Sequence, residues 1–233
     1  MSFKLGDSVW ERSDNLLPDT MSDRQYILAV TMFTVYGLFL TSIIGYNTMA
    51  WHPTSIWTVL GIGLVIPIIG IIIALKSDFW PVSLAGYTMV VVGLGIIIGP
   101  CVAMYKTTVV INAIMATFGV TCIMSLTGII YPKSLAHWGG YLSGALLALI
   151  VVRCIQIYMF SRGMMYEGHG WMIYIEYAGA VLFSLYIIYD WNRAMRLTHT
   201  LDNAVDCALA IYLDIINLFL HLLKILGSRS SSD

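Results

Sequence analysis

Two aspartates of this 233-residue chain lie in apolar stretches, where an ionised carboxylate is costly. Asp190 closes one apolar run, and Asp214 lies near the middle of the last one, with about ten residues of apolar pattern on either side. The aspartate side chain is too short to reach water from that depth, so Asp214 needs a partner, a proton or a cation. Asp190 taken alone is equally well interpreted as an interfacial aspartate close to Arg193.

A close pair of buried carboxylates has a definite chemistry. Two carboxylates in a low-dielectric site cannot both ionise easily, so the pair can share one proton. Once deprotonated, the pair offers the hard oxygen ligands that a divalent cation such as calcium prefers. Proton and cation then compete, and we predict that Asp190 and Asp214 form a pH sensor that also binds calcium.

The last apolar stretch carries further polar residues on one face. They are spaced by four, four, three and four positions along the chain: Asp206, Ala210, Asp214, Asn217 and His221. This spacing places them in one line along a helix, and the small side chain of Ala210 leaves space there for water or an ion. Lipid does not tolerate so many polar groups, so we expect this helix inside a bundle or against a wet cavity.

Three other charged side chains in or beside the apolar runs have competing interpretations. Glu176 lies about one and a half turns into its run, where an interfacial position is favoured. Arg153 has a long stem that can extend to the interface or pair with a carboxylate. We expect Lys76 or Arg153 to supply the positive charge that keeps the carboxylate pair ionised in a closed state. Four histidines in expected loops are interpreted as solvated: His52, His137, His169 and His199.

The composition excludes several classes of protein. Hydrophobic residues make up 59% of the chain and charged residues 11%, against about 25% charged in ordinary soluble domains. The formal net charge of −1 provides no basic field for a nucleic acid. An intramembrane metallohydrolase needs several ligands inside the spans, and only one histidine, His221, lies well inside one. We therefore expect an integral membrane protein that is no enzyme and carries no cofactor.

Seven apolar stretches approach the length of about 20 residues with which a helix crosses a membrane. They are Tyr26–Tyr46, Ile56–Leu75, Val82–Met104, Val109–Tyr131, Trp138–Phe160, Trp171–Tyr189 and Ala204–Leu226. We predict an all-α integral membrane protein, a seven-helix bundle whose polar last helix, spanning or re-entrant, is surrounded by the six apolar ones. Residues 1–25 are expected to form an N-terminal tail, 26–227 a single transmembrane domain and 228–233 a disordered tail.

The distribution of positive charge predicts an orientation. With the N-terminus inside, the inner segments hold seven lysines and arginines and the outer loops hold two, so the N-terminus is predicted to be cytoplasmic. The mixed charges of the first residues do not fit a signal peptide. Two glycine pairs, Gly95 with Gly99 and Gly140 with Gly144, have the spacing that lets helices approach closely. We expect both pairs to serve packing within the bundle rather than a dimer.

The polar residues of the last two stretches belong to a longer motif. It consists of Phe183–Asp190 (FSLYIIYD), Asp202, Ala208–Leu220 (ALAIYLDIINLFL) and Leu222–Gly227 (LLKILG). This motif resembles the Bax inhibitor family of membrane proteins, also called the transmembrane BAX inhibitor motif family. Upstream, Gly95–Pro100 (GIIIGP) is similar to the family's signature of a glycine, four residues and a proline in the third span.

The resemblance implies a pH-sensitive calcium leak channel. It also implies a di-aspartyl sensor at Asp190 and Asp214, whose separation of 24 residues equals the family's usual spacing. In bacterial members an arginine of the second span pairs with the sensor and latches the closed state. The second span of this chain has no arginine, and Lys76 at its end is the nearest cation. Asp206 and Glu176 are additions to the family pattern.

The resemblance also bears on location and partners. The basic C-terminal tail of the endoplasmic-reticulum members is absent, which favours a bacterial-type protein of the plasma (inner) membrane. Some bacterial relatives modulate a membrane-bound ATP-dependent protease, so a membrane interaction protein is the alternative function. The lipid bilayer is the expected surrounding in either case, and the oligomeric state is left open.

Overall fold

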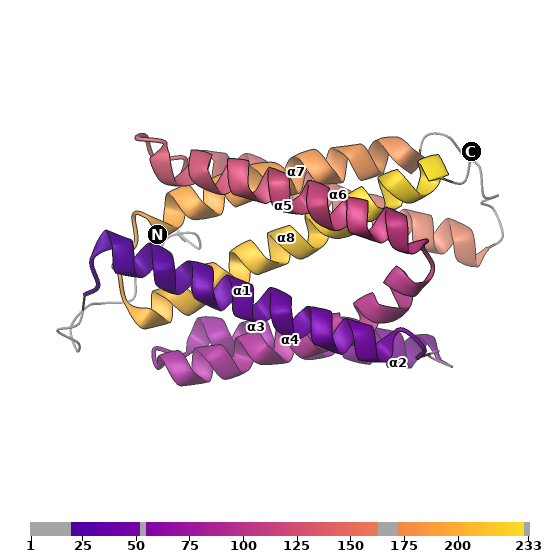
Figure 1. Cartoon of the computed structure of the whole chain (residues 1–233), viewed down its shortest axis with the longest axis horizontal. Coiled ribbons are helices and arrows are strands. Elements are labelled where there is room, and N and C mark those ends of the chain that lie inside the picture. Colours follow the sequence, from indigo (N-terminus) through magenta and orange to yellow (C-terminus); the bar gives the residue numbers. More distant parts are fainter. Residues whose placement is uncertain (1–19, 52–54, 163–171, 231–233) are drawn as a thin grey trace, which may run out of the picture. The chain divides into compact units, whose positions relative to one another are not determined.

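Every regular element within the described residues is a helix (Figure 1). The computed structural model describes residues 20–51, 55–162 and 172–230. The helices are α1 (Asp23–Thr48), α2 (Ile56–Leu60), the π-helix η1 (Gly61–Val65), α3 (Ile66–Lys76), α4 (Trp80–Ala103), α5 (Thr107–Ile130), α6 (Trp138–Ser161), α7 (Met172–Ala194) and α8 (Leu201–Ser230). Seven stretches among the described residues are long and apolar enough to cross a membrane, which confirms the predicted all-α membrane fold.

Two helix ends differ from those expected. Helix α7 continues to Ala194, so Asp190 lies one turn inside the helix and not at its end. Helix α8 continues to Ser230, so the first three residues of the expected disordered tail are helical. Both helices carry an arginine in the last turn, where positive charge is favourable next to the negative end of the helix dipole. The rest of that tail, 231–233, and residues 1–19 of the N-terminal tail lie outside the described residues.

The second membrane-spanning stretch is a helix with one wide turn. The π-helix η1 separates α2 from α3 and ends two residues before Pro67. Proline has no N–H to donate and its ring clashes with the preceding turn, so the helix widens there. Helix α4 accommodates this turn with a glycine, because a Cβ on Gly93 would press on the Ile62 carbonyl and the Pro67 ring.

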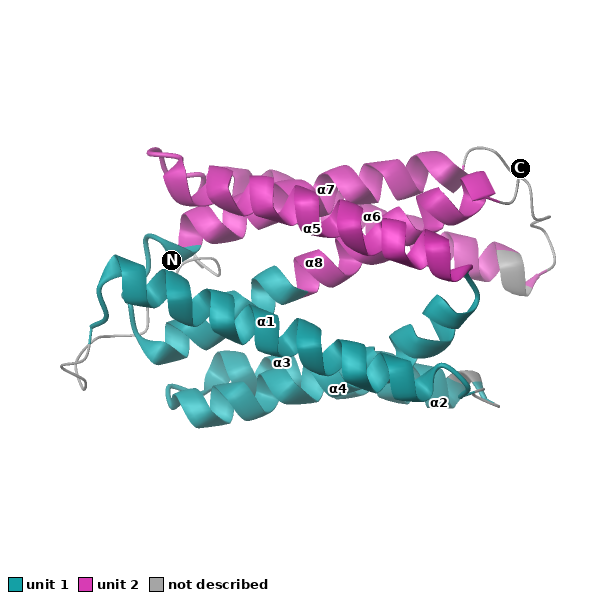
Figure 2. Ribbon diagram, in the orientation of Figure 1, with its two compact units in different colours: residues 1–105, 194–212 teal, residues 106–193, 213–233 magenta. Residues whose placement is uncertain are grey.

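The chain forms two compact units (Figure 2). The first comprises residues 1–105 and 194–212, and the second comprises 106–193 and 213–233. Helix α8 contributes its first part to the first unit and its remainder to the second. Of the seven spanning stretches it is the most buried, with 56% of its apolar window buried against 6% for α6. The polar helix is therefore an interior element, as its composition requires.

In the first unit, α4 packs against both α1 and α3. Glycines make this contact close. A Cβ on Gly70 of α3 would meet the carbonyl oxygen of Gly86, and a Cβ on Gly86 would meet the carbonyl oxygen of Gly70. On the other side, a Cβ on Gly99 would overlap the carbonyl oxygen of Gly45 in α1. The helix backbones therefore touch at these glycines, which is how small residues hold membrane helices together.

The two glycine pairs singled out in the sequence serve different surfaces. Gly95 and Gly99 pack against α1, as expected. A Cβ built on Gly140 or Gly144 would meet nothing within 4 Å in the described part of the chain. The expectation of packing within the bundle is therefore wrong for this second pair, because both glycines lie on an exposed face of α6. Glycine spacing predicts that another helix can approach closely, but it does not identify that helix.

The start of α1 is tied to the segment before α8. Ser22 caps α1 through reciprocal hydrogen bonds with Gln25. The ring of His199 stacks on Tyr26 with the ring centroids 4.3 Å apart, and its backbone carbonyl accepts a hydrogen bond from the Met21 N–H. His199 is therefore not the solvated loop residue that we expected, because its imidazole covers an aromatic face.

In the second unit, α7 packs against α5 and α6. A Cβ on Gly128 of α5 would meet the Ile188 carbonyl and the Trp191 side chain, and a Cβ on Gly139 of α6 would meet the Tyr189 hydroxyl. These contacts involve the turns of α7 on either side of Asp190. Close glycine contacts therefore position the part of α7 that carries the aspartate.

Asn192 fixes the same part of α7 to the connection between α5 and α6. Its Oδ1 accepts a hydrogen bond from the Leu135 N–H at 3.0 Å. Its Nδ2 donates to the carbonyl oxygens of Tyr131 and Lys133 at 3.0 and 3.1 Å. One side chain thus satisfies several backbone groups of a connection, two residues away from Asp190.

Replacement of Gly86 tests the close packing of α3 and α4. We expect Gly86→Ala to lower the free energy of unfolding by about 1–3 kcal/mol, because the new Cβ would overlap the backbone of α3. Thermal unfolding in detergent measures the change. Gly140→Ala is the matched control, since its Cβ enters open space and should leave the midpoint unchanged. Equal midpoints for the two variants would contradict this packing.

Candidate functional site

Asp190 of α7 and Asp214 of α8 meet within the second unit. Asp214 is buried, with 6% of its surface exposed. The two carboxyl groups share a hydrogen bond. An ionised carboxylate can only accept, so this hydrogen bond requires one proton between the two groups. The structure therefore brings together the two aspartates that the sequence analysis singled out, in an arrangement that fits a singly protonated pair.

One oxygen of this pair has no hydrogen-bond partner among the described residues. The Oδ2 atom of Asp214 is buried and makes no hydrogen bond to any described residue. A buried acceptor without a partner costs about 1–3 kcal/mol, so native proteins normally satisfy such an atom with water, a proton or an ion. Carboxylate oxygens are also the ligands that calcium prefers. The Oδ2 atom is therefore where a cation or a water molecule can bind.

The positive charge that acts on Asp190 comes from its own helix. Arg193, one turn further along α7, attracts the Asp190 carboxylate. Tyr186, one turn before it, forms a hydrogen bond with Ser143 of α6 and interacts electrostatically with both aspartates. Lys76, one of the two cations expected at the pair, ends α3 in the first unit. The sequence analysis treated Arg193 only as a neighbour at a helix end, because spacing does not reveal where its charge acts.

The remaining residues of the polar face differ in their surroundings. Asp206 is buried in the part of α8 that belongs to the first unit. Ala210, which lies between Asp206 and Asp214 along α8, is half-buried. The side-chain amide of Asn217 donates to the Leu213 carbonyl of its own helix at 2.8 Å. Only the residues from Asp214 onward therefore belong to the same unit as Asp190.

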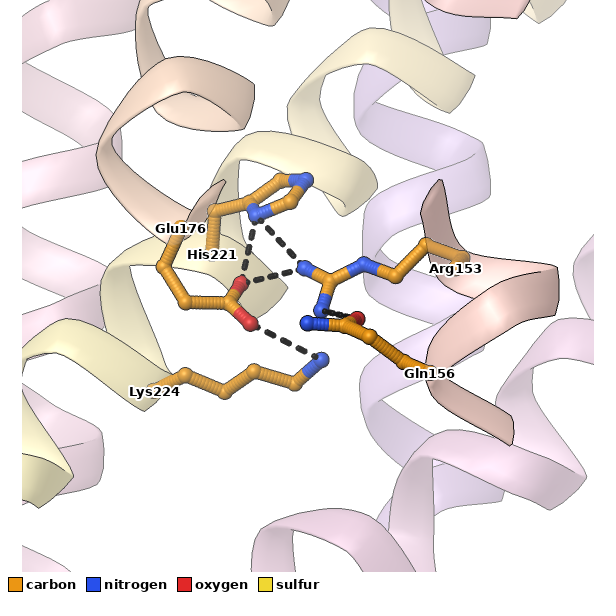
Figure 3. Close-up of polar contacts among 5 residues, drawn as sticks. All are labelled: Arg153, Gln156, Glu176, His221 and Lys224. Atoms are coloured by element: carbon orange, nitrogen blue, oxygen red, sulfur yellow. Dashed lines mark hydrogen bonds and ion pairs between the residues drawn. The ribbon is translucent and has the colours of Figure 1, made fainter. Parts of the chain in front are cut away.

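A second polar cluster joins α6, α7 and α8 further along α8 (Figure 3). We call Arg153, Glu176, His221 and Lys224 the Glu176 cluster. The Oε2 atom of Glu176 accepts from Arg153 Nη2 at 2.6 Å and lies 2.7 Å from His221 Nδ1. The Oε1 atom lies 3.7 Å from Lys224 Nζ. One carboxylate thus faces two permanent cations and one imidazole.

The Glu176 cluster bears on what the sequence predicted for Glu176 and Arg153. Glu176 is 7% exposed, so protein covers it, and three nitrogen-bearing side chains compensate the burial of its charge. Arg153 pairs with Glu176 and with Gln156, whose Oε1 accepts from Nη1 at 2.9 Å. The guanidinium therefore pairs with a carboxylate, one of the two alternatives left open for it, and this carboxylate is that of Glu176 and not one of the Asp190–Asp214 pair.

The sequence analysis missed the residues that make room for His221. A Cβ on Gly179 would overlap the imidazole ring. The ring of Phe183 stacks on the imidazole of His221, with the two ring centroids 5.6 Å apart. Glu176, Gly179 and Phe183 follow each other at spacings of three and four, so one face of α7 provides the acceptor, the space and the stacking partner. That spacing was visible in the sequence but had no meaning without the facing helix.

Within the described ranges, no group of three or more His, Cys, Asp or Glu side chains is placed to hold a metal ion. Calcium takes six to eight oxygen ligands, and two aspartates supply at most about four of them. A cation at Asp190 and Asp214 would therefore keep part of its water shell, which suits transient binding.

Comparison with known proteins identifies relatives along nearly the whole chain. A family model described as "Inhibitor of apoptosis-promoting Bax1" matches residues 23–231. The inner membrane protein YbhL of Escherichia coli (strain K12) is 24% identical over 94% of this chain and 97% of its own length. An uncharacterized protein of Helicobacter pylori (strain 26695) is 32% identical over 65% of this chain and 60% of its own length. Protein LIFEGUARD 3 of Arabidopsis thaliana is 38% identical over 38% of this chain and 33% of its own length.

Removal of the central carboxylate tests the Glu176 cluster. Glu176→Gln keeps the side-chain shape but leaves the partly buried Arg153 without its counter-charge. We expect the free energy of unfolding to fall by about 1–3 kcal/mol in chemical denaturation. The double variant Glu176→Gln with Arg153→Met removes both charges and should recover part of the loss. Losses that simply add in the double variant would show that the two side chains are not coupled.

Proposed function

This chain belongs to the Bax inhibitor family of membrane proteins, and we propose that it is a pH-sensitive leak channel for calcium. In this proposal cations pass down their gradient, and proton occupancy of the Asp190–Asp214 pair gates the flux. The protein performs no catalytic chemistry, and calcium is its cargo. The observation that carries the proposal is the buried Oδ2 of Asp214, which has no partner among the described residues although it belongs to a hydrogen-bonded carboxyl pair.

The proposed gating follows from competition at the carboxyl pair. With one proton shared, the pair carries a single negative charge and its hydrogen bond holds the α7 and α8 carboxyl groups together. Loss of that proton leaves two negative charges that repel each other and attract a divalent cation. Calcium then replaces the proton and reduces the repulsion between the two carboxylates. Flux should therefore rise as the pH rises through the range in which the pair loses its proton. This direction is opposite to that of the latch expected from the sequence, in which the ionised pair belongs to the closed state, because Arg193, which acts on Asp190, lies on the same helix and does not tie α7 to another one.

Location and orientation are part of the proposal. The excess of lysine and arginine in alternate loops favours an N-terminus in the cytoplasm. The similarity to YbhL, named as an inner membrane protein, supports the inner membrane of a bacterium as the location. In this orientation α8 leads from the cytoplasmic side toward the outer side, so a cation that follows its polar face crosses the membrane.

One observation favours a second candidate function. Gly140 and Gly144 present a backbone-rich face of α6 that no described residue covers. Such a face suits close packing with a helix of another membrane protein. A membrane interaction protein that modulates a membrane-bound ATP-dependent protease is therefore the alternative. Wild-type protein that passes no calcium in liposomes would favour it over the leak channel.

Asp214→Asn tests the sensor directly. Asparagine keeps the shape and much of the hydrogen bonding but cannot ionise, so we expect the pH dependence of calcium flux to flatten while the protein remains folded. Flux is measured with a calcium-sensitive dye inside liposomes at several pH values. Asp78→Asn, at an exposed aspartate between α3 and α4, is the matched control and should keep the wild-type profile. An unchanged profile in Asp214→Asn would mean that Asp214 is only structural.

The cation that favours the ionised pair is found by three single replacements, Lys76→Met, Arg153→Met and Arg193→Met. Removal of a nearby positive charge favours the protonated carboxyl pair, so the true partner shifts the pH midpoint of flux upward. The electrostatic contact with Asp190 favours Arg193, whereas Arg153 is engaged by Glu176. The three titrations are compared in the same liposomes. If no midpoint moves, the pair is held by proton sharing alone.

A further inference from the structure

His221 lies on the same face of α8 as Asp214 and in the same unit. Seven residues separate them, about 10 Å along the helix axis. A cation that follows the polar face of α8 from the carboxyl pair must therefore pass the Glu176 cluster. Neither the gating proposed above nor the similarity to known proteins assigns a role to this cluster.

The imidazole of His221 is held in one position. Phe183 stacks on the ring, and Gly179 leaves the space that the ring fills. The carboxylate of Glu176 binds Nδ1 (Figure 3). At 2.7 Å from a carboxylate oxygen, Nδ1 must carry a hydrogen and donate it. Arg153 Nη2 lies 3.5 Å from the same Nδ1, and because both atoms are donors this approach is not a hydrogen bond. The neutral ring therefore has its proton on Nδ1, and protonation at Nε2 adds a full positive charge.

Of the four side chains of the Glu176 cluster, the imidazole is the one that becomes positively charged when it takes up a proton. Among the described residues, the charged groups that contact His221 or its carboxylate are Arg153 from α6, Glu176 from α7 and Lys224 from α8 itself. With a neutral imidazole the cluster has two positive charges and one negative. With a protonated imidazole it has three positive charges and one negative. Imidazole is the side chain that ordinarily changes its charge near neutral pH.

We propose that His221 is a proton-operated charge switch that raises an electrostatic barrier to cations two turns beyond the Asp190–Asp214 pair. The inference rests on the proposed leak and adds a second control point to it. Protonated His221 repels a cation on the polar face of α8, and neutral His221 lowers the barrier. Gly179 and Phe183 act as positioning residues, because they keep the ring between Glu176 and the cation path.

The barrier at His221 should discriminate between ions by their charge. Coulomb repulsion scales with the charge of the passing ion, so one added positive charge hinders calcium more than potassium. Both control points reduce calcium flux in acid. The contribution of the carboxyl pair is present in every variant that keeps Asp190 and Asp214. The difference between wild type and a His221 variant therefore isolates the barrier.

The test compares calcium and potassium flux in liposomes for wild type, His221→Gln and His137→Gln. Glutamine can still donate to Glu176 but cannot become charged, and His137 is an exposed histidine before α6 that serves as the matched control. Between about pH 8 and about pH 5.5, we expect the calcium-to-potassium flux ratio to fall at least about fivefold more in wild type than in His221→Gln. His137→Gln should follow wild type.

Each outcome separates this inference from the leak on which it rests. A wild-type protein that passes no cation overturns the proposed leak, and the barrier with it. A conducting wild type whose flux ratio changes with pH as it does in His221→Gln overturns the barrier alone. Nitrogen-15 NMR of histidine-labelled wild type in lipid provides a reading that does not depend on the folding of a variant. A His221 ring that carries its proton on Nδ1 and gains a second one in acid supports the switch, and a ring that stays neutral throughout this pH range overturns it.

Discussion

A carboxylate buried among apolar helices must be neutralised, and the arrangement of the second unit follows from how this is done twice. Asp214 and Glu176 are 6% and 7% exposed, so neither can rely on water. Each obtains its partner from a neighbouring helix, Asp190 from α7 for one and Arg153 from α6 for the other. Helices α6, α7 and α8 are therefore held together by hydrogen bonds and ion pairs as well as by packing.

The two solutions differ in what they allow. Two acids that share a proton form a pair whose charge changes when one proton leaves. An acid between an arginine, a lysine and a histidine keeps its charge, and in the proposed switch the histidine is the member that takes up a proton. The first arrangement attracts a cation when it loses a proton, and the second repels one when it gains a proton. Acid conditions therefore act in the same direction at both places along α8.

The fold could be predicted from the sequence because membrane spans are set by length and apolarity, which Tyr26–Tyr46 or Val109–Tyr131 display without reference to the rest of the chain. The pairing of Asp190 with Asp214 could be anticipated because a mid-helix aspartate demands a partner. The Glu176 cluster could not be anticipated. A glutamate four residues after the start of a helix is expected near the membrane interface, and the sequence does not show that other helices cover it. Likewise Gly179 gains its meaning only from the His221 ring of α8.

The central claim is that calcium and one shared proton compete for the Asp190–Asp214 pair. Infrared difference spectroscopy of the protein in lipid at neutral pH, with and without calcium, tests it most directly, because protonated and ionised carboxyl groups absorb at different frequencies. The account predicts a carboxylic-acid band that calcium removes and that is missing from Asp214→Asn. A wild-type spectrum without such a band, or with a band that calcium leaves unchanged, would contradict the account.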